Sequence, residues 1–144
     1  MATVSFQELK DDHRLIERLA DNIVQLLSDA VPDIDEILSV RLELSAEIRA
    51  HWALEDALMR AWAASDRGKD SYHYVKGLTL EYRSFREEWD EYLYEWGAES
   101  IAADWGCFCD QTRRIIRRLN DKAAAEDVYI YPLALRIGII PRNG

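Results

Sequence analysis

Apolar side chains recur along this chain at alternating steps of three and four residues, the spacing of one face of an α-helix. The pattern fills four stretches, which are separated by short segments containing Pro, Gly, Asp or Ser. The first stretch begins at Ser5, which can cap a helix together with Glu8, and it ends before Val31-Pro32-Asp33. Its inward positions are Leu9, His13, Ile16, Ala20, Ile23 and Leu27.

The second stretch begins near Asp33 or Asp35, runs to about Ala64 and is ended by residues 65–68. Its later half places both apolar and ionisable residues on one stripe: Leu44, Ile48, His51, Glu55, Leu58 and Trp62. The third begins around Asp70 or Ser71 and is stopped by Gly97. It keeps a seven-residue repeat through Val75, Leu78, Tyr82, Phe85, Trp89, Tyr92 and Trp96.

The fourth stretch begins near Ser100, and Pro132 should kink or end it, because proline removes one backbone hydrogen bond and clashes with the preceding turn. Residues 136–144 are expected to be irregular or weakly ordered. The inward positions are Trp105, Phe108, Thr112, Ile115, Leu119, Lys122, Glu126, Tyr129 and Leu133. Four such helices with short connections predict an all-α, antiparallel up-down-up-down four-helix bundle, with residues 1–144 as a single domain.

Composition and charge narrow the class of protein further. Hydrophobic residues make up 49% and charged residues 31%, as in soluble globular proteins. The net charge of −9 argues against nucleic acid as a partner, because phosphate binding needs a basic face. The first twelve residues do not resemble a secretory signal, and no stretch is apolar enough to span a membrane. Cys107 and Cys109 are too close together in the sequence to form a disulfide that stabilises the fold. A cytoplasmic location follows as the default.

The candidate chemistry lies on the inward stripes. His51 and Glu55 are four residues apart, so their side chains stack one turn above each other and point toward an apolar interior. Such a pair forms half of a metal site of the kind found in helical bundles. A single pair of this kind is a weak signal, since the two side chains could also simply satisfy each other in a core.

A repeat between the two halves of the chain strengthens the signal. The segment from His51 to Met59 aligns with Lys122 to Ile130, and residues 12–14 align with 81–83. The spacings agree, with 38 residues from His13 to His51 and 40 from Tyr82 to Lys122. Because buried polar groups are costly unless paired or bound to metal, we expect the six inward groups to form one site or network. These are His13, His51, Glu55, Tyr82, Lys122 and Glu126.

Three motifs resemble the hemerythrin-like (HHE cation-binding) family in its bacterial-type form: Asp12-His13-Arg14, the segment His51–Asp56 and the segment Glu126–Leu133. The resemblance implies a four-helix bundle around a non-haem di-iron centre, held by histidines on all four helices and by two bridging carboxylates. Members bind oxygen reversibly, store or sense iron, or sense oxygen and redox state. By this resemblance the metal ligands are His13, His51, Glu55 and Glu126.

The chain departs from the family pattern at two ligand positions. Lys122 stands where the family has a histidine before its final Glu, and Tyr82 stands at the third-helix position. His73 lies off the inward stripe of its helix, and the chain has only three histidines, so a five-histidine di-iron site is excluded. Tyr82 and Lys122 are therefore expected to replace metal or to lie around it.

The sequence leaves three alternatives for what occupies the site. One metal ion (iron, zinc or manganese) could bind the four ligands, or two ions could bind carboxylates and a tyrosinate with Lys122 displaced. Alternatively, no metal binds and the Lys122 ammonium bridges Glu55 and Glu126. Charge favours the metal-free arrangement over the single ion and both over the pair, because two carboxylates keep a lysine protonated and an ammonium repels a divalent ion.

The sequence therefore predicts a hemerythrin-like protein with a degenerate non-haem iron site and a regulatory or sensing role rather than oxygen carriage. The alternative is a functional mono- or dinuclear iron protein that binds oxygen or iron through His13, His51, Glu55 and Glu126. No nucleophile–base pair, phosphate loop or nucleotide motif supports an enzyme of the transferase or hydrolase kind. A protein partner or a homodimer is compatible with the sequence, and a membrane is not expected.

Overall fold

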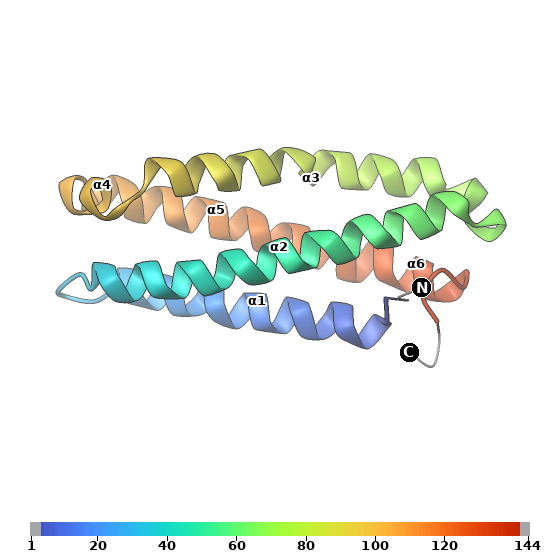
Figure 1. The fold of residues 1–144 in the computed structure, drawn as a ribbon, viewed down its shortest axis with the longest axis horizontal. Helices are drawn as coiled ribbons and strands as arrows, with labels where there is room; N and C mark the ends of the chain where they lie inside the picture. The colour runs from blue at the N-terminus through green and yellow to red at the C-terminus, as the bar shows by residue number, and fades with distance from the viewer. Residues whose placement is uncertain (1–3, 142–144) are drawn as a thin grey trace.

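The computed structural model describes residues 4–141. Four long helices run antiparallel along a common axis (Figure 1): α1 (Phe6–Leu27), α2 (Ile34–Ala64), α3 (Lys69–Glu95) and α5 (Trp105–Ala125). Helix α1 packs on α2 and α5, and α3 closes the bundle against the same two helices. The predicted all-α, up-down-up-down bundle is confirmed. Shorter elements join or extend the helices: η1 (Asp66–Gly68), α4 (Ala98–Ala103), η2 (Glu126–Ile130) and α6 (Tyr131–Arg136).

The starts of the helices follow from capping side chains. The Ser5 hydroxyl accepts a hydrogen bond from the backbone of Glu8 at 3.0 Å, as predicted for the first helix. The Asp33 carboxylate does the same for Glu36 at 3.1 Å, which settles the start of α2.

The fourth predicted helix is divided, which the apolar pattern did not indicate. It was expected to be continuous from Ser100, but α4 ends at Ala103 and α5 starts at Trp105. The reason is Asp104, whose non-helical backbone (φ −145°, ψ 70°) interrupts the helix while its carboxylate accepts a hydrogen bond from the Cys107 N–H at 3.2 Å. The interruption places Gly106 in a first helical turn rather than in a helix interior, where glycine is unfavourable.

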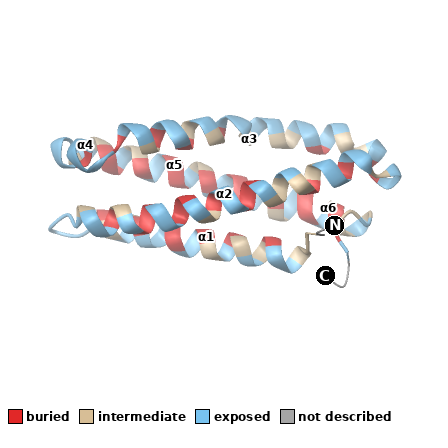
Figure 2. Ribbon diagram, in the orientation of Figure 1, coloured by how far each residue is buried: buried red, intermediate tan, exposed pale blue. Residues whose placement is uncertain are grey.

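Buried residues occur along the whole length of the bundle (Figure 2), and the apolar ones form two clusters. The larger cluster, toward α4, contains a run of aromatic rings: Phe85, Trp89, Tyr92, Trp96 and Phe108. The smaller cluster, at the opposite end, contains Leu9, Leu58, Trp62, Val75, Ile130, Tyr131, Ala134 and Ile140. On α1, α2 and the α5–η2 segment, polar residues lie between the residues of one cluster and those of the other. The candidate site is therefore a polar layer across the bundle.

The end of the chain is better packed than the sequence indicated. Residues 137–141 lack a helix, as expected, but the side chain of Ile140 is fully buried in the smaller cluster. The backbone N–H groups of Ile139 and Ile140 both bond the Ala134 carbonyl, at 2.8 and 3.1 Å. Gly138, with φ of +84°, makes the reversal that this requires. Residues 142–144 of the predicted tail lie outside the described residues.

Two glycines give a matched prediction about packing. A Cβ on Gly68 would lie 2.6 Å from Cδ1 and 2.7 Å from the carbonyl oxygen of Trp62, whereas one on Gly77 would meet nothing within 4 Å. We expect Gly68→Ala to destabilise the fold by about 1–3 kcal/mol, because the rigid indole and the backbone must both move. Gly77→Ala in α3 should instead stabilise it by about 0.5–1 kcal/mol. Urea unfolding of both variants checks this, and equal shifts would contradict it.

Candidate metal centre

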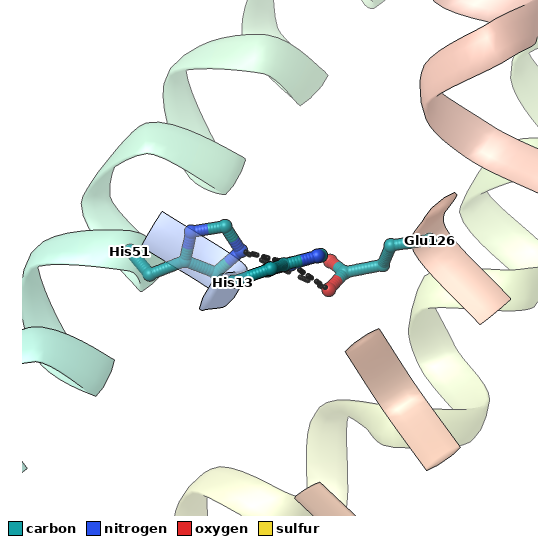
Figure 3. A group of neighbouring side chains, drawn as sticks. All are labelled: His13, His51 and Glu126. Atoms are coloured by element: carbon teal, nitrogen blue, oxygen red, sulfur yellow. Dashed lines mark hydrogen bonds and ion pairs between the residues drawn. The ribbon is translucent and has the colours of Figure 1, made fainter. Parts of the chain in front are cut away.

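Three buried side chains from separate parts of the chain converge on one point (Figure 3). His13 comes from α1, His51 from α2, and Glu126 from the first residue of η2. The Nε2 atoms of the two histidines are 3.0 Å apart. Oε1 of Glu126 lies 3.2 Å from Nε2 of His13 and 3.8 Å from Nε2 of His51. All three candidate ligand atoms lie within 4.8 Å of one another, which is a spacing that one cation could bridge.

A carboxylate holds the opposite side of each imidazole. Nδ1 of His13 bonds Asp127 at 2.9 Å, and Nδ1 of His51 bonds Asp12 at 3.3 Å. Because a carboxylate accepts, each Nδ1 carries a proton, and each Nε2 presents a lone pair unless a second proton occupies it. Two nitrogen lone pairs and the carboxylate Oε1 then face one another, an arrangement that requires a proton or a metal ion between them. Carboxylates placed behind imidazoles in this way orient the histidines of metal sites.

Tyr131 completes this cluster; the sequence placed it in the last motif of the family resemblance but gave it no role in the site. Its side chain is fully buried, and its hydroxyl lies 3.2 Å from Nε2 of His13 and 3.0 Å from Nε2 of His51. The reason is the π-helical turn Glu126–Ile130, in which the Tyr131 N–H bonds the Glu126 carbonyl five residues back. In an α-helix five residues would separate the two side chains by about 140°. The wider turn brings them to the same face.

The same turn corrects the predicted stripe of the fourth helix. Within η2 and α6 the buried positions beyond Glu126 are Ile130, Tyr131 and Ala134, while Tyr129 is 54% exposed and Leu133 only partly buried. Pro132 was predicted to kink or end the fourth helix. The regular helix α5 ends at Ala125, and the proline lies in the first turn of α6, after the π-helical turn. Proline has no N–H to donate, so the backbone bonding must change before it.

Lys122 and Glu55 form the second half of the site. The ammonium of Lys122 lies 2.6 Å from Oε1 of Glu55 and 3.5 Å from Oε2 of Glu126, as expected for a lysine that bridges two carboxylates. Oε1 of Glu55 also contacts Nε2 of His51 at 3.0 Å, which links the lysine to the histidines. On the outer side, Arg86 bonds Asp56 through both terminal nitrogens and lies 3.9 Å from Glu55.

The ionisation of these groups follows from their contacts. Burial alone would lower the pKa of Lys122, but the charges of Glu55 and Glu126 outweigh it and raise that pKa, so the amine is protonated. Burial alone would raise the pKa of Glu126. The bonds of Glu126 to His13 and His51 and the charge of Lys122 outweigh burial and hold this pKa well below its usual range. The pKa of Glu55 is raised, chiefly by burial and by Glu126. Glu126 is thus the carboxylate held ionised most firmly.

The structure brings together five of the six predicted side chains: His13, His51, Glu55, Lys122 and Glu126. Tyr82 does not join their hydrogen bonds. It is partly buried and lines an adjoining pocket with Glu55, Lys122 and Glu126, because its position on α3 faces that opening rather than the imidazoles. His73 is exposed on α3, as the pattern predicted.

The site residues missed from the sequence are Asp12, Arg86, Asp127 and Tyr131. Asp12 and Asp127 each stand beside a predicted ligand in the sequence, which is a usable signal. The pairing is crossed, however: Asp12 is adjacent to His13 but bonds His51, and Asp127 is adjacent to Glu126 but bonds His13. Only the packing of α1 on its neighbours determines this.

A helical bundle in which imidazoles and carboxylates converge on one buried point is a cation-binding domain in its architecture. The chain belongs to the hemerythrin HHE cation-binding domain family, whose sequence model matches residues 4–134. No curated protein and no solved structure gives a significant match to it. Across the part of the chain that the structure describes, no helix has the length and apolarity needed to cross a membrane.

The metal-free protein should lose stability as the pH rises above 6.5. Burial alone would lower the pKa of His51, but its bonds to Glu126 and Glu55 outweigh burial and raise it to about 10. A raised pKa contributes stability that is complete below the unfolded value of about 6.5 and is lost as the pH rises toward the folded one. Between pH 6.5 and 8.5 the free energy of unfolding should fall by roughly 2 kcal/mol. Chemical denaturation in the presence of a chelator measures this.

The control for that prediction is His51→Gln, which keeps a polar side chain but cannot titrate. Its free energy of unfolding should change little over the same range of pH. A wild-type profile as flat as that of the variant would contradict the charge assigned to His51.

Proposed function

We propose that this chain is a hemerythrin-family domain whose di-iron pocket is reduced to a site for one cation, with a regulatory or sensing role rather than one in oxygen carriage. The observation that carries the proposal is the convergence of two imidazole Nε2 atoms and a carboxylate oxygen beside a lysine that already bridges two carboxylates.

The donor set fits one metal ion. Imidazole nitrogens with carboxylate and phenol oxygens suit iron, zinc or manganese, and His13, His51 and Glu126 would hold such an ion with Tyr131 beside it. A bound ion would supply Lewis acidity and, as iron, one-electron redox chemistry. The residues around it have separate tasks. Asp12 and Asp127 fix the imidazole orientations and keep the Nε2 lone pairs inward.

The donor set does not fit a second ion. By resemblance to the family, Lys122 and Tyr82 occupy positions of histidine ligands for the pair of irons. The Lys122 ammonium has no lone pair to offer, and its charge repels a divalent ion at the place where Glu55 and Glu126 would bridge. Oxygen carriage in the family rests on two irons, so a site for one ion favours another role.

A metal-free site is the alternative, in which a proton takes the place of the cation. The raised pKa of His51, about 10, supports it, because the imidazole is then doubly protonated at neutral pH and supplies the positive charge. Metal must displace this proton, so its affinity should increase with pH. The polar layer lies between the two apolar clusters, so a change of its occupant affects residues on three helices. This position supports a sensing role.

Metal stoichiometry tests the proposal. The metal content is measured by inductively coupled plasma mass spectrometry on two samples: protein purified from iron-supplemented cells, and protein stripped with a chelator and reloaded anaerobically with Fe²⁺, Zn²⁺ or Mn²⁺. Each sample should contain up to one ion per chain. Two ions would restore the di-iron alternative, and none under any condition would leave only the proton-filled core. A sensing role also requires that loading change hydrogen exchange in α1, α2 and η2, and unchanged exchange would contradict it.

A further inference from the structure

A pocket of about 180 Å³ lies beside the cation site, between α2, α3 and the α5–η2 segment. Its lining includes Glu55, Lys122 and Glu126 but neither histidine. An engineered cavity of about 150 Å³ holds a benzene molecule. The pocket can therefore take one ring-sized group with a small polar head.

The lining is mainly apolar or aromatic away from these charged residues. Met59 of α2, Ile130 of η2 and Leu78 of α3 line it together with Tyr72 and Tyr82. Leu80, also in the lining, is 49% exposed and leaves an apolar side chain open at this face of α3. An apolar body that covers these side chains would be removed from water, which favours its binding.

The charges of the pocket are not balanced. Four cationic side chains line it (Lys76, Arg83, Arg86 and Lys122) against three carboxylates (Glu55, Asp56 and Glu126), in a protein whose net charge is −9.

The excess positive charge lies on α3. Lys122 is held by Glu55 and Glu126, and Arg86 is held by Asp56. Within the described residues no carboxylate forms an ion pair with Lys76 or Arg83, both of which are exposed. The two are seven residues apart in α3, so they lie on one side of the helix, two turns apart.

We propose that this pocket binds a small carboxylic acid with a ring-sized apolar body. Its carboxylate is held at the rim by Lys76 and Arg83, and its body packs against Met59, Leu78 and Ile130. Affinity for so small a ligand is modest, so the dissociation constant should be near millimolar. The site is separate from the imidazole nitrogens, so binding does not require the cation.

Benzoate and its neutral analogue benzamide are the probes, and saturation-transfer NMR titration of the metal-free and the metal-loaded protein is the measurement. Benzoate should bind both forms, at least about tenfold more tightly than benzamide. Equal binding of the two probes would overturn the assignment of a carboxylate. Benzoate bound only when metal is present would also overturn it and would place the carboxylate on the ion instead.

Variants locate the site. The double variant Lys76→Gln/Arg83→Gln should weaken benzoate about fivefold to tenfold and leave benzamide unchanged. Ala125→Leu, which fills the pocket, should abolish binding of both probes. The matched control Arg113→Gln/Arg117→Gln removes two charges from exposed positions of α5 outside the pocket, and it should bind as wild type does. A control as weak as the pocket variant, or undiminished binding in Ala125→Leu, would overturn the proposal. Metal stoichiometry of each variant distinguishes this failure from failure of the cation site.

Discussion

Replacing His51 with alanine is expected to weaken cation binding on the order of a hundredfold or more. The side chain supplies one of two converging Nε2 atoms, and it also contacts Glu55 and Tyr131. Loss even of a group that only supports a metal ligand costs about 10–100-fold in affinity, so loss of a ligand should cost at least as much. Competition titration of Zn²⁺ against a chromophoric chelator at fixed pH measures the change.

The chain offers its own control for that experiment. His73 is exposed on α3 and takes no part in the site, so His73→Ala should bind Zn²⁺ as the wild-type protein does. A similar loss of affinity in both variants would mean that the metal is bound by surface imidazoles. An unchanged affinity in His51→Ala would remove His51 from the set of ligands.

The second large effect is expected at Lys122. Lys122→Met keeps the length and apolar volume of the side chain but removes the charge that lies 2.6 Å from Glu55 and 3.5 Å from Glu126. Removing one partner of a buried ion pair typically costs about 3–5 kcal/mol, because the other charge stays buried without compensation. The metal-free variant should be destabilised by that amount in urea unfolding at pH 7.

Lys69→Met is the matched control, because the Lys69–Asp66 pair spans a similar 3.1 Å while its side chains are 72% and 93% exposed. An exposed pair of this kind contributes little, so the control should lie within about 0.5 kcal/mol of wild type. Adding Glu55→Gln to Lys122→Met should recover part of the loss, since it removes one of the two uncompensated carboxylates. If Lys122→Met were as mild as the control, the ammonium would not be what balances the site.

Periodicity and capping chemistry were sufficient to predict the bundle. Ser5 and Asp33 cap their helices by accepting a hydrogen bond from a backbone N–H three residues further along the chain. Both caps were predictable because the two partners are so close in the sequence. The division of the fourth helix at Asp104 was not predicted, because the apolar stripe continues through it and only the backbone of that residue changes.

The site was predictable to the extent that it follows α-helical periodicity. His13, His51, Glu55, Lys122 and Glu126 all lie on regular stripes, and charge balance indicated the place of Lys122. Beyond Glu126 the helix leaves that period, so Tyr131 was missed and Tyr129 was wrongly placed inside. A π-turn has no periodic signature of its own, and here Pro132 was its only local sign.

The π-turn also determines how the site can change. The Tyr131 hydroxyl is held near both imidazoles by one surplus peptide unit in the backbone between it and Glu126. Loss of a single residue from this turn would let the α-helix continue with Tyr131 four residues after Glu126, about 40° away around the helix, so the phenol would stay on the same face. A return to α-helical bonding with all five residues kept would instead turn the phenol about 140° away from Glu126, so the surplus residue and the π-turn keep Tyr131 in the site only together.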